Sequence, residues 1–346
     1  MQGHVSETAV ALYFVASPLQ YLAARRIATD FERGARQVLI WYKPGVEPAV
    51  RRSEWDAARY MPWPRFHPMP GAFGRHRRLR ENLRMVAELA GRCDRLHIHS
   101  AVFDTEAINY FLHGLPPLCG HPAMHARILP DGLLSVRRYP LTPLKRALQH
   151  LRRLRTLVAP ELRYWCFSGD RIGSDAPFCD RIYVLPGLPH EYDPGKTIVL
   201  PPLTDRTPAQ SAPSAMRALV IGQPLVGAGL MEGRDRDAVA RQIADWLGAH
   251  GAHEVDYKGH PKDPNRELNQ PAYRVVEPDE ALESYMSRQT YRFVVGVRSS
   301  ALLFARQIYG GDTRVVAFGW DRVRFKSAQE EASMRAAFET CGVEMR

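Results

Sequence analysis

The stretch Lys258-Gly259-His260-Pro261 places a histidine between two lysines, Lys258 and Lys262, directly after a segment whose alternating pattern predicts a strand. Glycine and proline favour a turn at this point. A histidine on such a turn can offer its imidazole to a ligand, and the flanking cations suit an anionic one. An ordinary surface turn would have the same sequence, so the stretch alone does not define a site.

A pair of hydroxyl groups occurs in the same half of the chain. Ser299 and Ser300 follow the apolar segment 291–297 and precede the helical spacing of 301–307. Hydroxyl groups and free backbone N–H groups at a helix N-terminus together form a phosphate site. A single serine would be explained as a helix cap, whereas two serines in the same β/α array as the Gly-His-Pro turn favour a phosphate ligand.

A candidate carboxylate, Asp131, follows the segment 124–129 in the first half of the chain. In open α/β sheets, ligands bind at the carboxyl ends of strands, which is where this side chain would lie. Asp131-Gly132 is also a common turn dipeptide. By the same argument Ser17 and Gln20, after the first strand, are candidates for donor or acceptor contact, although a helix cap explains them equally well.

The elements that would position these residues alternate along the chain. In the first half, strands are predicted at 10–16, 37–42, 65–69, 95–99 and 124–129, short extended segments at 164–168 and 181–185, and helices at 19–31, 47–60, 75–91, 104–113 and 142–157. In the second half, strands are predicted at 217–221, 253–257, 273–276, 291–297 and 313–318, and helices at 234–250, 279–286, 301–307 and 327–338. Gly222 and Gln223 follow the first of these later strands and are further candidate ligand contacts.

A linker divides the two arrays. The stretch 204–214 is rich in proline, serine and alanine and predicts a boundary between a domain at 1–203 and a domain at 215–346. Two successive β/α arrays predict two Rossmann-like domains facing across a cleft, the architecture called GT-B among nucleotide-sugar transferases.

The composition limits the class of protein. The chain has 346 residues, a net charge of +10 and five cysteines. This charge suits a phosphate, a polyanionic acceptor or an acidic membrane surface, whereas no zinc-finger, RNP or helix-turn-helix pattern supports nucleic acid. The cysteine spacing fits no zinc site, and the odd count argues against a full disulfide framework. With no signal peptide or apolar span, we expect a cytoplasmic protein.

The predicted helix 142–157 is basic and amphipathic. Its cations are Lys145, Arg146, Arg152, Arg153 and Arg155, and its apolar stripe consists of Leu144, Leu148 and Leu151. Such a helix can lie on an anionic membrane, here the inner membrane, or face a charged acceptor. A solvated helix face would produce the same pattern.

Four short motifs together resemble those of bacterial sialyltransferases and α-2,8-polysialyltransferases. Lys258-Gly259-His260-Pro261 looks like their HP motif, and Ser299-Ser300 looks like their paired-serine motif. The stretch 278–282, Pro-Asp-Glu-Ala-Leu, is similar to the Pro-x-Glu stretch of that family, and Asp131-Gly132 looks like the end of its acidic-acidic-Gly motif. The order of the motifs along the chain also agrees.

The resemblance implies a GT-B enzyme that moves a nonulosonic acid, usually sialic acid, from a CMP-activated donor to a hydroxyl of a surface glycan. The acceptor would be a capsule, a lipooligosaccharide or a similar glycan, anionic or lipid-linked. Transfer would invert the anomeric centre and need neither a metal nor a cofactor. Asp131 would be the general base, and His260 would hydrogen-bond or protonate the departing CMP phosphate.

The resemblance also implies that the first domain carries the acceptor side and that the second binds the nucleotide at a donor site. Its members would be Ser299 and Ser300 on the phosphate, Glu280 on the ribose hydroxyls, and Lys258, Gly259 and Pro261 around the cytosine. The chemistry is consistent with these roles, because the bond between a tertiary anomeric carbon and a phosphate breaks readily once the negative charge on the departing phosphate is stabilised.

One position departs from the pattern. Pro130 precedes Asp131 where the family usually has an acidic residue, so Asp104 and Glu106 are further candidates for the base. His97 and His99 alternate on one strand face and are structural or acceptor-contacting, since no third metal ligand is suitably spaced. Two rival functions remain, namely a transferase that uses CMP-Kdo or a UDP-sugar, and a non-catalytic binder of anionic glycan or nucleic acid.

Overall fold

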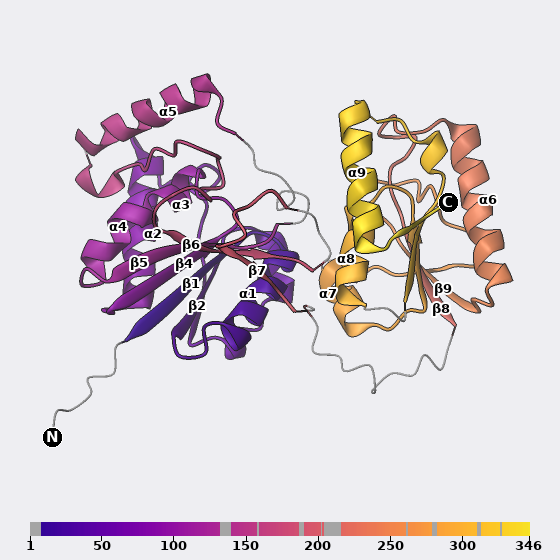
Figure 1. Ribbon diagram of the computed structural model, residues 1–346, viewed down its shortest axis with the longest axis horizontal. Coiled ribbons are helices and arrows are strands. Elements are labelled where there is room, and N and C mark those ends of the chain that lie inside the picture. The colour runs from indigo at the N-terminus through magenta and orange to yellow at the C-terminus, as the bar shows by residue number, and fades with distance from the viewer. Residues whose placement is uncertain are drawn as a thin grey trace. The chain divides into compact units, whose positions relative to one another are not determined.

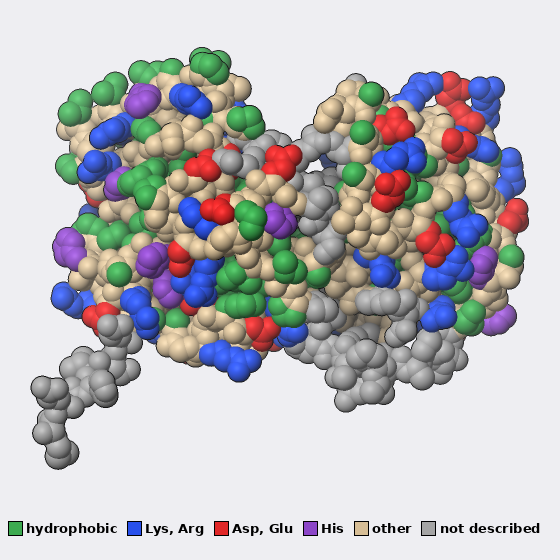
Figure 2. All heavy atoms as spheres, in the orientation of Figure 1, with side chains coloured by type: hydrophobic (Ala, Val, Ile, Leu, Met, Phe, Trp, Pro, Cys, Tyr) green, Lys and Arg blue, Asp and Glu red, His purple; other side chains and the backbone are tan. Residues whose placement is uncertain are grey.

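The computed structural model describes residues 8–131, 140–157, 159–186, 190–201, 203, 216–260, 262–278, 282–309, 313–325 and 327–346. The chain forms two compact units (Figure 1). Unit 1 contains the described residues up to Val184 together with 190–200, and unit 2 contains Leu185, Pro186 and the described residues from Pro201 onward. Basic side chains are spread over the visible surfaces of both units, in keeping with the positive net charge (Figure 2).

Seven strands in the described part of unit 1 form one parallel sheet in the order β3-β2-β1-β4-β5-β6-β7. This order reverses between β1 and β4, as in the Rossmann fold. The central strand β1 is apolar along its length because both of its faces are covered. The strands are β1 Ala9–Val15, β2 Arg36–Trp41, β3 Ala57–Tyr60, β4 Arg95–Ser100, β5 Ala123–Ile128, β6 Cys179–Val184 and β7 Thr197–Val199.

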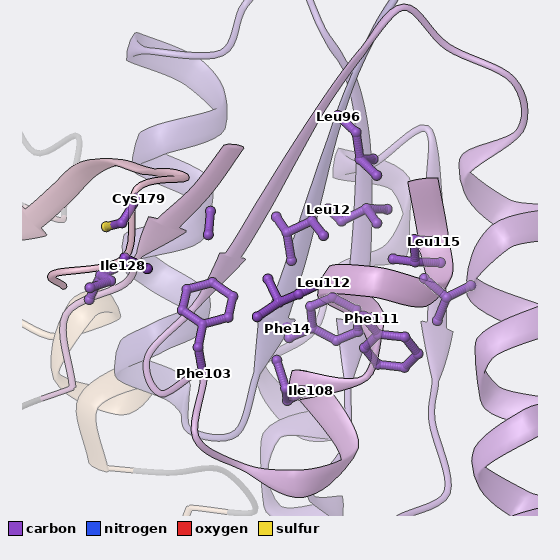
Figure 3. Packing of buried hydrophobic residues seen from close by; sticks show 14 of the residues in the cluster. Leu12, Phe14, Leu96, Phe103, Ile108, Phe111, Leu112, Leu115, Ile128 and Cys179 are labelled. Carbon is purple, nitrogen blue, oxygen red and sulfur yellow. The ribbon is translucent and has the colours of Figure 1, made fainter. Parts of the chain in front are cut away.

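The helices of unit 1 connect these strands. They are α1 Pro18–Asp30, α2 Gly74–Ala90, α3 Glu106–Asn109, α4 Phe111–Leu118 and α5 Pro143–Arg153, with 3₁₀ helices η1 Pro44–Ala49, η2 Arg52–Glu54, η4 Leu154–Leu157 and η5 Pro160–Leu162. Packing of α4 on the sheet is visible in Figure 3, where Phe111 and Leu112 lie beside Phe14 of β1. The rings of Phe14 and Phe111 stack with centroids 4.9 Å apart.

Unit 2 repeats the same topology. In its described part, six parallel strands have the order β10-β9-β8-β11-β12-β13, which reverses between β8 and β11. The strands are β8 Arg217–Ile221, β9 Glu254–Lys258, β10 Arg274–Val275, β11 Phe293–Gly296, β12 Arg314–Ala317 and β13 Glu344–Met345. The helices are α6 Gly233–Ala249, α7 Leu282–Arg288, α8 Ser300–Ile308 and α9 Ala328–Cys341, with η7 at Trp320–Arg322.

The prediction of two Rossmann-like domains is confirmed, since each unit has a parallel sheet in Rossmann order. Leu185 and Pro186 belong to unit 2, although the sequence boundary lay later, at 203. One contact that ties this segment to unit 2 is a 2.6 Å hydrogen bond, which the side-chain amide of Gln307 donates to the carbonyl of Pro186. The predicted linker 204–214 lies outside the described residues.

Two predictions in unit 1 are wrong. The segment 47–60 is not one helix but the end of η1, then η2 and strand β3, because residues 57–60 pair with β2. The segment 65–69 is a loop rather than a strand. Among the described helices, none combines the length and apolar character that crossing a membrane requires.

Candidate functional site

A pocket of about 690 Å³ lies at the carboxyl edge of the sheet of unit 1. Loops that follow five neighbouring strands contribute to its wall, as expected at the point where a Rossmann sheet reverses direction. We call it the aromatic pocket, because Tyr42, Tyr60, Trp63 and Phe66 line it. Its polar lining includes Ser17, Gln20, Lys43, His67, Thr105 and Asp131.

Asp131 lies in this pocket beside the aromatic wall. Burial raises the pKa of Tyr42 well above its usual value, and the negative charge of Asp131 raises it further. The ring of Tyr42 stacks on Trp63 with centroids 4.6 Å apart. Among the described residues that line the pocket, Asp131 is the one carboxylate. Rings beside a carboxylate suit a ligand that has apolar faces and hydroxyl groups.

The other two candidate bases are held elsewhere. Asp104 accepts hydrogen bonds on Oδ1 from the Gln149 amide at 2.8 Å and from the Tyr164 hydroxyl at 2.9 Å. Glu106 forms ion pairs with Arg155 and with Arg75. Neither of these two carboxylates lines the aromatic pocket. These hydrogen bonds and ion pairs are with side chains outside the pocket.

Ser17 and Gln20 shape the turn after β1. The Ser17 hydroxyl caps α1 by accepting the backbone N–H of Gln20 at 3.3 Å. The Gln20 side-chain carbonyl in turn accepts the backbone N–H of Ala16 at 2.7 Å, and the Gln20 side chain is buried. The helix-cap interpretation is therefore confirmed, and both residues also line the aromatic pocket.

His97 and His99 are buried on β4. Nδ1 of His97 lies 2.9 Å from a carboxylate oxygen of Glu32, and His99 donates a hydrogen bond from Nδ1 to the carbonyl of Leu12 at 3.1 Å. Burial, aided by the neighbouring His97, lowers the pKa of His99 to about 3. These contacts give both histidines hydrogen-bonding partners next to the sheet, and neither residue lines the aromatic pocket.

The other predicted site residues follow neighbouring strands at the carboxyl edge of the sheet of unit 2. Strands β9, β8 and β11 are neighbours there, and they are followed by Gly259-His260, Gly222-Gln223 and Ser299-Ser300 respectively. The sheet reverses between β8 and β11, so this is the edge at which a Rossmann fold binds ligands. Two predicted donor contacts, Pro261 and Glu280, lie outside the described residues.

His260 is exposed, and a backbone hydrogen bond defines its tautomer. The backbone N–H of Lys262 donates to Nδ1 of the imidazole at 3.0 Å, so in the neutral ring the proton is on Nε2. Partial burial lowers the pKa of His260, and the charge of Lys262 lowers it further. At neutral pH this side chain is therefore an uncharged hydrogen-bond donor through Nε2.

Glycines allow the first two loops to approach each other. The Gly222 N–H donates to the carbonyl of Lys258 at 2.9 Å, which continues the pairing of β8 and β9. A Cβ at position 222 would lie 2.4 Å from the Tyr257 hydroxyl and 3.2 Å from the Cα of Gly259. Only glycine fits this position without a shift of the buried Tyr257, which explains the Gly222 of the sequence.

Gln223 joins the loops that follow β8 and β11. Its side-chain carbonyl accepts the backbone N–H of Arg298 at 2.9 Å. The Arg298 guanidinium donates hydrogen bonds to the carbonyl of Arg324 at 3.0 Å and to Glu330 at 3.2 Å. These bonds fix the position of the loop that contains Arg298. These contacts position the N-terminus of α8.

Ser299 is the N-cap of α8, and its hydroxyl oxygen accepts the backbone N–H of Ala301 at 3.3 Å. The hydroxyl keeps its own proton, which it can donate to an oxygen of a bound anion. Ser300 is the first residue of the helix. Nearby, the Lys258 ammonium donates to the carbonyl of Gly259 at 2.9 Å, and burial lowers the pKa of this lysine. This edge therefore combines hydroxyl, imidazole and ammonium donors.

Sequence reasoning missed several residues of the aromatic pocket, namely Tyr42, Lys43, Trp63 and His67. Tyr42 ends the predicted strand 37–42 and Lys43 follows it, whereas β2 ends at Trp41, so the carboxyl-end argument could have found both residues. Trp63 and His67 lie in the loop that follows β3. The sequence did not indicate them, because 47–60 was assigned to a helix and 65–69 to a strand. Among the described residues, no group of three or more His, Cys, Asp or Glu side chains is arranged to hold a metal ion.

No protein-family model matches the sequence, and neither does any curated protein. Solved structures that resemble the chain include the glycotransferase of kitacinnamycin, at 12% identity over 98% of this chain and 86% of that chain, with a TM-score of 0.47. Spinosyn rhamnosyltransferase matches at 14% identity over 96% and 91%, with a TM-score of 0.47. The E. coli ADP-heptose LPS heptosyltransferase II matches at 12% identity over 89% and 84%, with a TM-score of 0.43. At this level these likenesses carry no conclusion about activity.

Proposed function

We propose that this protein is an inverting, metal-independent glycosyltransferase that transfers sialic acid or a related nonulosonic acid from a CMP-activated donor to a glycan hydroxyl. The observation that carries the proposal is the position of the predicted chemical groups. Asp131 lines a pocket at the carboxyl edge of one Rossmann sheet, and His260 and Ser299 lie at the carboxyl edge of the other. The four motifs occur in the order found in bacterial sialyltransferases.

The donor half of the reaction uses the edge of unit 2. The bond between the anomeric carbon of the sugar and the CMP phosphate breaks, and its electron pair remains on the phosphate oxygen. The Nε2–H of His260 and the hydroxyl of Ser299 donate hydrogen bonds to that phosphate as its negative charge grows. The N-terminus of α8 adds a favourable dipole. This set of donors takes the place of a metal ion.

The acceptor half uses the aromatic pocket of unit 1. A sugar packs its apolar face against the aromatic wall, and Asp131 accepts the proton of the attacking hydroxyl. The hydroxyl oxygen forms the new bond to the anomeric carbon on the face opposite the departing phosphate. The products are the extended glycan, CMP and one proton on the carboxylate.

A donor panel tests the proposal. Purified protein is incubated with an oligosaccharide acceptor mixture and with CMP-sialic acid, CMP-Kdo or a UDP-sugar, and the released nucleotide is measured. We expect CMP release from CMP-sialic acid or another CMP-nonulosonate, with a loss of about 10²–10⁴-fold in Asp131→Asn and no change in Asp321→Asn, whose side chain is 77% exposed. Turnover of only the UDP-sugar or CMP-Kdo would replace the donor assignment, and binding without any turnover would support a non-catalytic role.

A further inference from the structure

Helix α5 turns its leucines away from the protein. Leu144, Leu148 and Leu151 are 72%, 43% and 61% exposed, and Leu154 and Leu157 of the following η4 turn are 58% and 84% exposed. Figure 2 shows hydrophobic side chains over this helix, at the top of the unit on the left. A helix of a globular protein normally directs its apolar stripe at the core. Here the stripe has the opposite orientation.

Polar side chains hold the helix on the protein. Within α5, all of whose residues are described, Gln149 is the one buried residue. Its amide donates to Asp104 at 2.8 Å, and Arg152 donates to the Tyr164 hydroxyl at 3.0 Å. Arg155 of η4 donates to the Tyr110 hydroxyl at 2.9 Å. These polar contacts determine which face of the helix packs on the protein. The leucine face is therefore held toward the solvent.

Cations accompany the exposed leucines. Lys145, Arg146 and Arg153 are exposed on α5. Beside the end of the helix, a pocket of about 470 Å³ is lined by His150, Arg153, Leu154, Thr156, Leu157 and Arg163. Arg153 and Arg163 make this pocket positively charged. Burial lowers the pKa of the neighbouring His113 to about 4, and the charges of these two arginines contribute to the shift. An anionic group of moderate size would fit between these arginines.

We propose that α5 and η4 dock this protein on a membrane surface that contains anionic phospholipids. The leucines enter the boundary between headgroups and acyl chains, and a headgroup phosphate lies in the pocket between Arg153 and Arg163. An exposed apolar stripe flanked by cations has the chemistry that binds such a surface, because apolar burial and attraction to anionic lipid add. A soluble polyanion would use the cations and leave the leucines in water.

Membrane docking and a solvated helix face predict different orientations of the leucines, and docking on a membrane does not require the transferase activity. A helix with a solvated polar face would turn its leucines toward the protein, whereas here the leucines are exposed and the side chains of Gln149 and Arg152 contact the protein. A second copy of the chain could also cover leucines, although the cationic pocket beside them gives no attraction to this net positive protein.

Vesicle co-sedimentation tests the proposal with the full chain. We expect the wild type to sediment with vesicles of 30 mol% phosphatidylglycerol in phosphatidylcholine and to remain in solution with pure phosphatidylcholine. The triple variant Leu144→Ser, Leu151→Ser, Leu157→Ser should reduce binding at least tenfold. These three side chains are more than half exposed, so folding should be unchanged by circular dichroism. Leu118→Ser, which removes a 50% exposed leucine of α4, serves as the matched control.

A charge series completes the test. Arg146→Gln with Arg153→Gln should reduce binding to the anionic vesicles, whereas Arg33→Gln with Arg241→Gln, also exposed, should not. Equal binding of the leucine variant and the wild type would overturn the proposal and indicate attraction to charge alone. Loss of a dimer in the leucine variant by light scattering, without vesicle binding by the wild type, would assign the leucines to a second copy instead.

Discussion

The backbone N–H of Lys262 donates a hydrogen bond to Nδ1 of His260, with 3.0 Å between the two nitrogens. This contact leaves Nε2 as the protonated nitrogen of a neutral ring and directs its hydrogen-bonding capacity away from the turn. Protonation of Nδ1 would break the contact, and the neighbouring Lys262 disfavours a second positive charge. His260 is therefore suited to donating a hydrogen bond to a phosphate while uncharged.

The tautomer of His260 predicts an order of activity among substitutions. A glutamine amide can place its N–H near the position of Nε2, whereas the asparagine amide reaches only Nδ1. We expect His260→Gln to lose about tenfold in kcat, and His260→Asn and His260→Ala to lose about 10²–10³-fold. Steady-state CMP release measures this order. Better activity in the asparagine variant than in the glutamine variant would show that Nδ1 is the acting nitrogen.

The acceptor assignment predicts a selective effect of Phe66. This side chain lines the aromatic pocket and is 72% exposed, so its removal should leave folding intact. Phe66→Ala should raise the KM for the acceptor about tenfold and leave the KM for the donor unchanged, because stacking on the sugar is lost. Phe73→Ala removes a similarly exposed ring that does not line the pocket and should change neither constant. A rise in the donor KM instead would place the donor in this pocket.

Two glycines of unit 2 predict opposite stability changes. Gly222→Ala should lower the free energy of unfolding by about 1–3 kcal/mol, since the new Cβ would meet the buried Tyr257 at 2.4 Å. Gly248→Ala, within α6 where a Cβ meets nothing within 4 Å, should raise it by about 0.5–1 kcal/mol. Urea denaturation measures both values. Equal effects would contradict the close approach of the β8 and β9 loops.

A buried carboxylate predicts acid sensitivity in unit 2. Burial acts to raise the pKa of Asp256, but hydrogen bonds from Arg274 and the Tyr291 hydroxyl outweigh it and lower the pKa below the unfolded value. The unfolded chain therefore binds more protons below pH 4, so this contribution to stability is present above the unfolded pKa and is lost as pH falls. Thermal unfolding from pH 7 to pH 3 should show a smaller decline for Asp256→Asn, which is already destabilised at pH 7. An identical decline would exclude Asp256 as a source of the sensitivity.

Apolar periodicity was enough to predict the central elements of both units. Strands such as β1 and β11 are continuous apolar runs because helices cover both faces of a parallel sheet. The edge strands β3, β7 and β13 escaped this signal, since they are two to four residues long and only partly buried. Their identity as strands comes from pairing with a neighbour, which sequence periodicity does not report.

The candidate site also has residues whose positions the sequence predicts and residues whose roles it does not. His260, Ser299 and Asp131 follow strands that the sequence predicts, so their positions at sheet edges could be inferred from the chain alone. The role of Asp104 could not, because its partners Gln149 and Tyr164 are distant in sequence and meet it only in the fold. The outward orientation of the α5 leucines was also beyond prediction, since periodicity identifies an apolar stripe but not the side on which the protein lies.

The catalytic assignment depends most directly on Asp131. The decisive measurement is the rate of CMP release from CMP-sialic acid, at saturating acceptor and pH 7, by the wild type and by Asp131→Asn. We predict turnover by the wild type and a loss of about 10²–10⁴-fold in the variant with unchanged CMP affinity, because an amide cannot accept the hydroxyl proton. Equal turnover by both proteins, or no CMP release and no CMP binding by the wild type, would contradict the account.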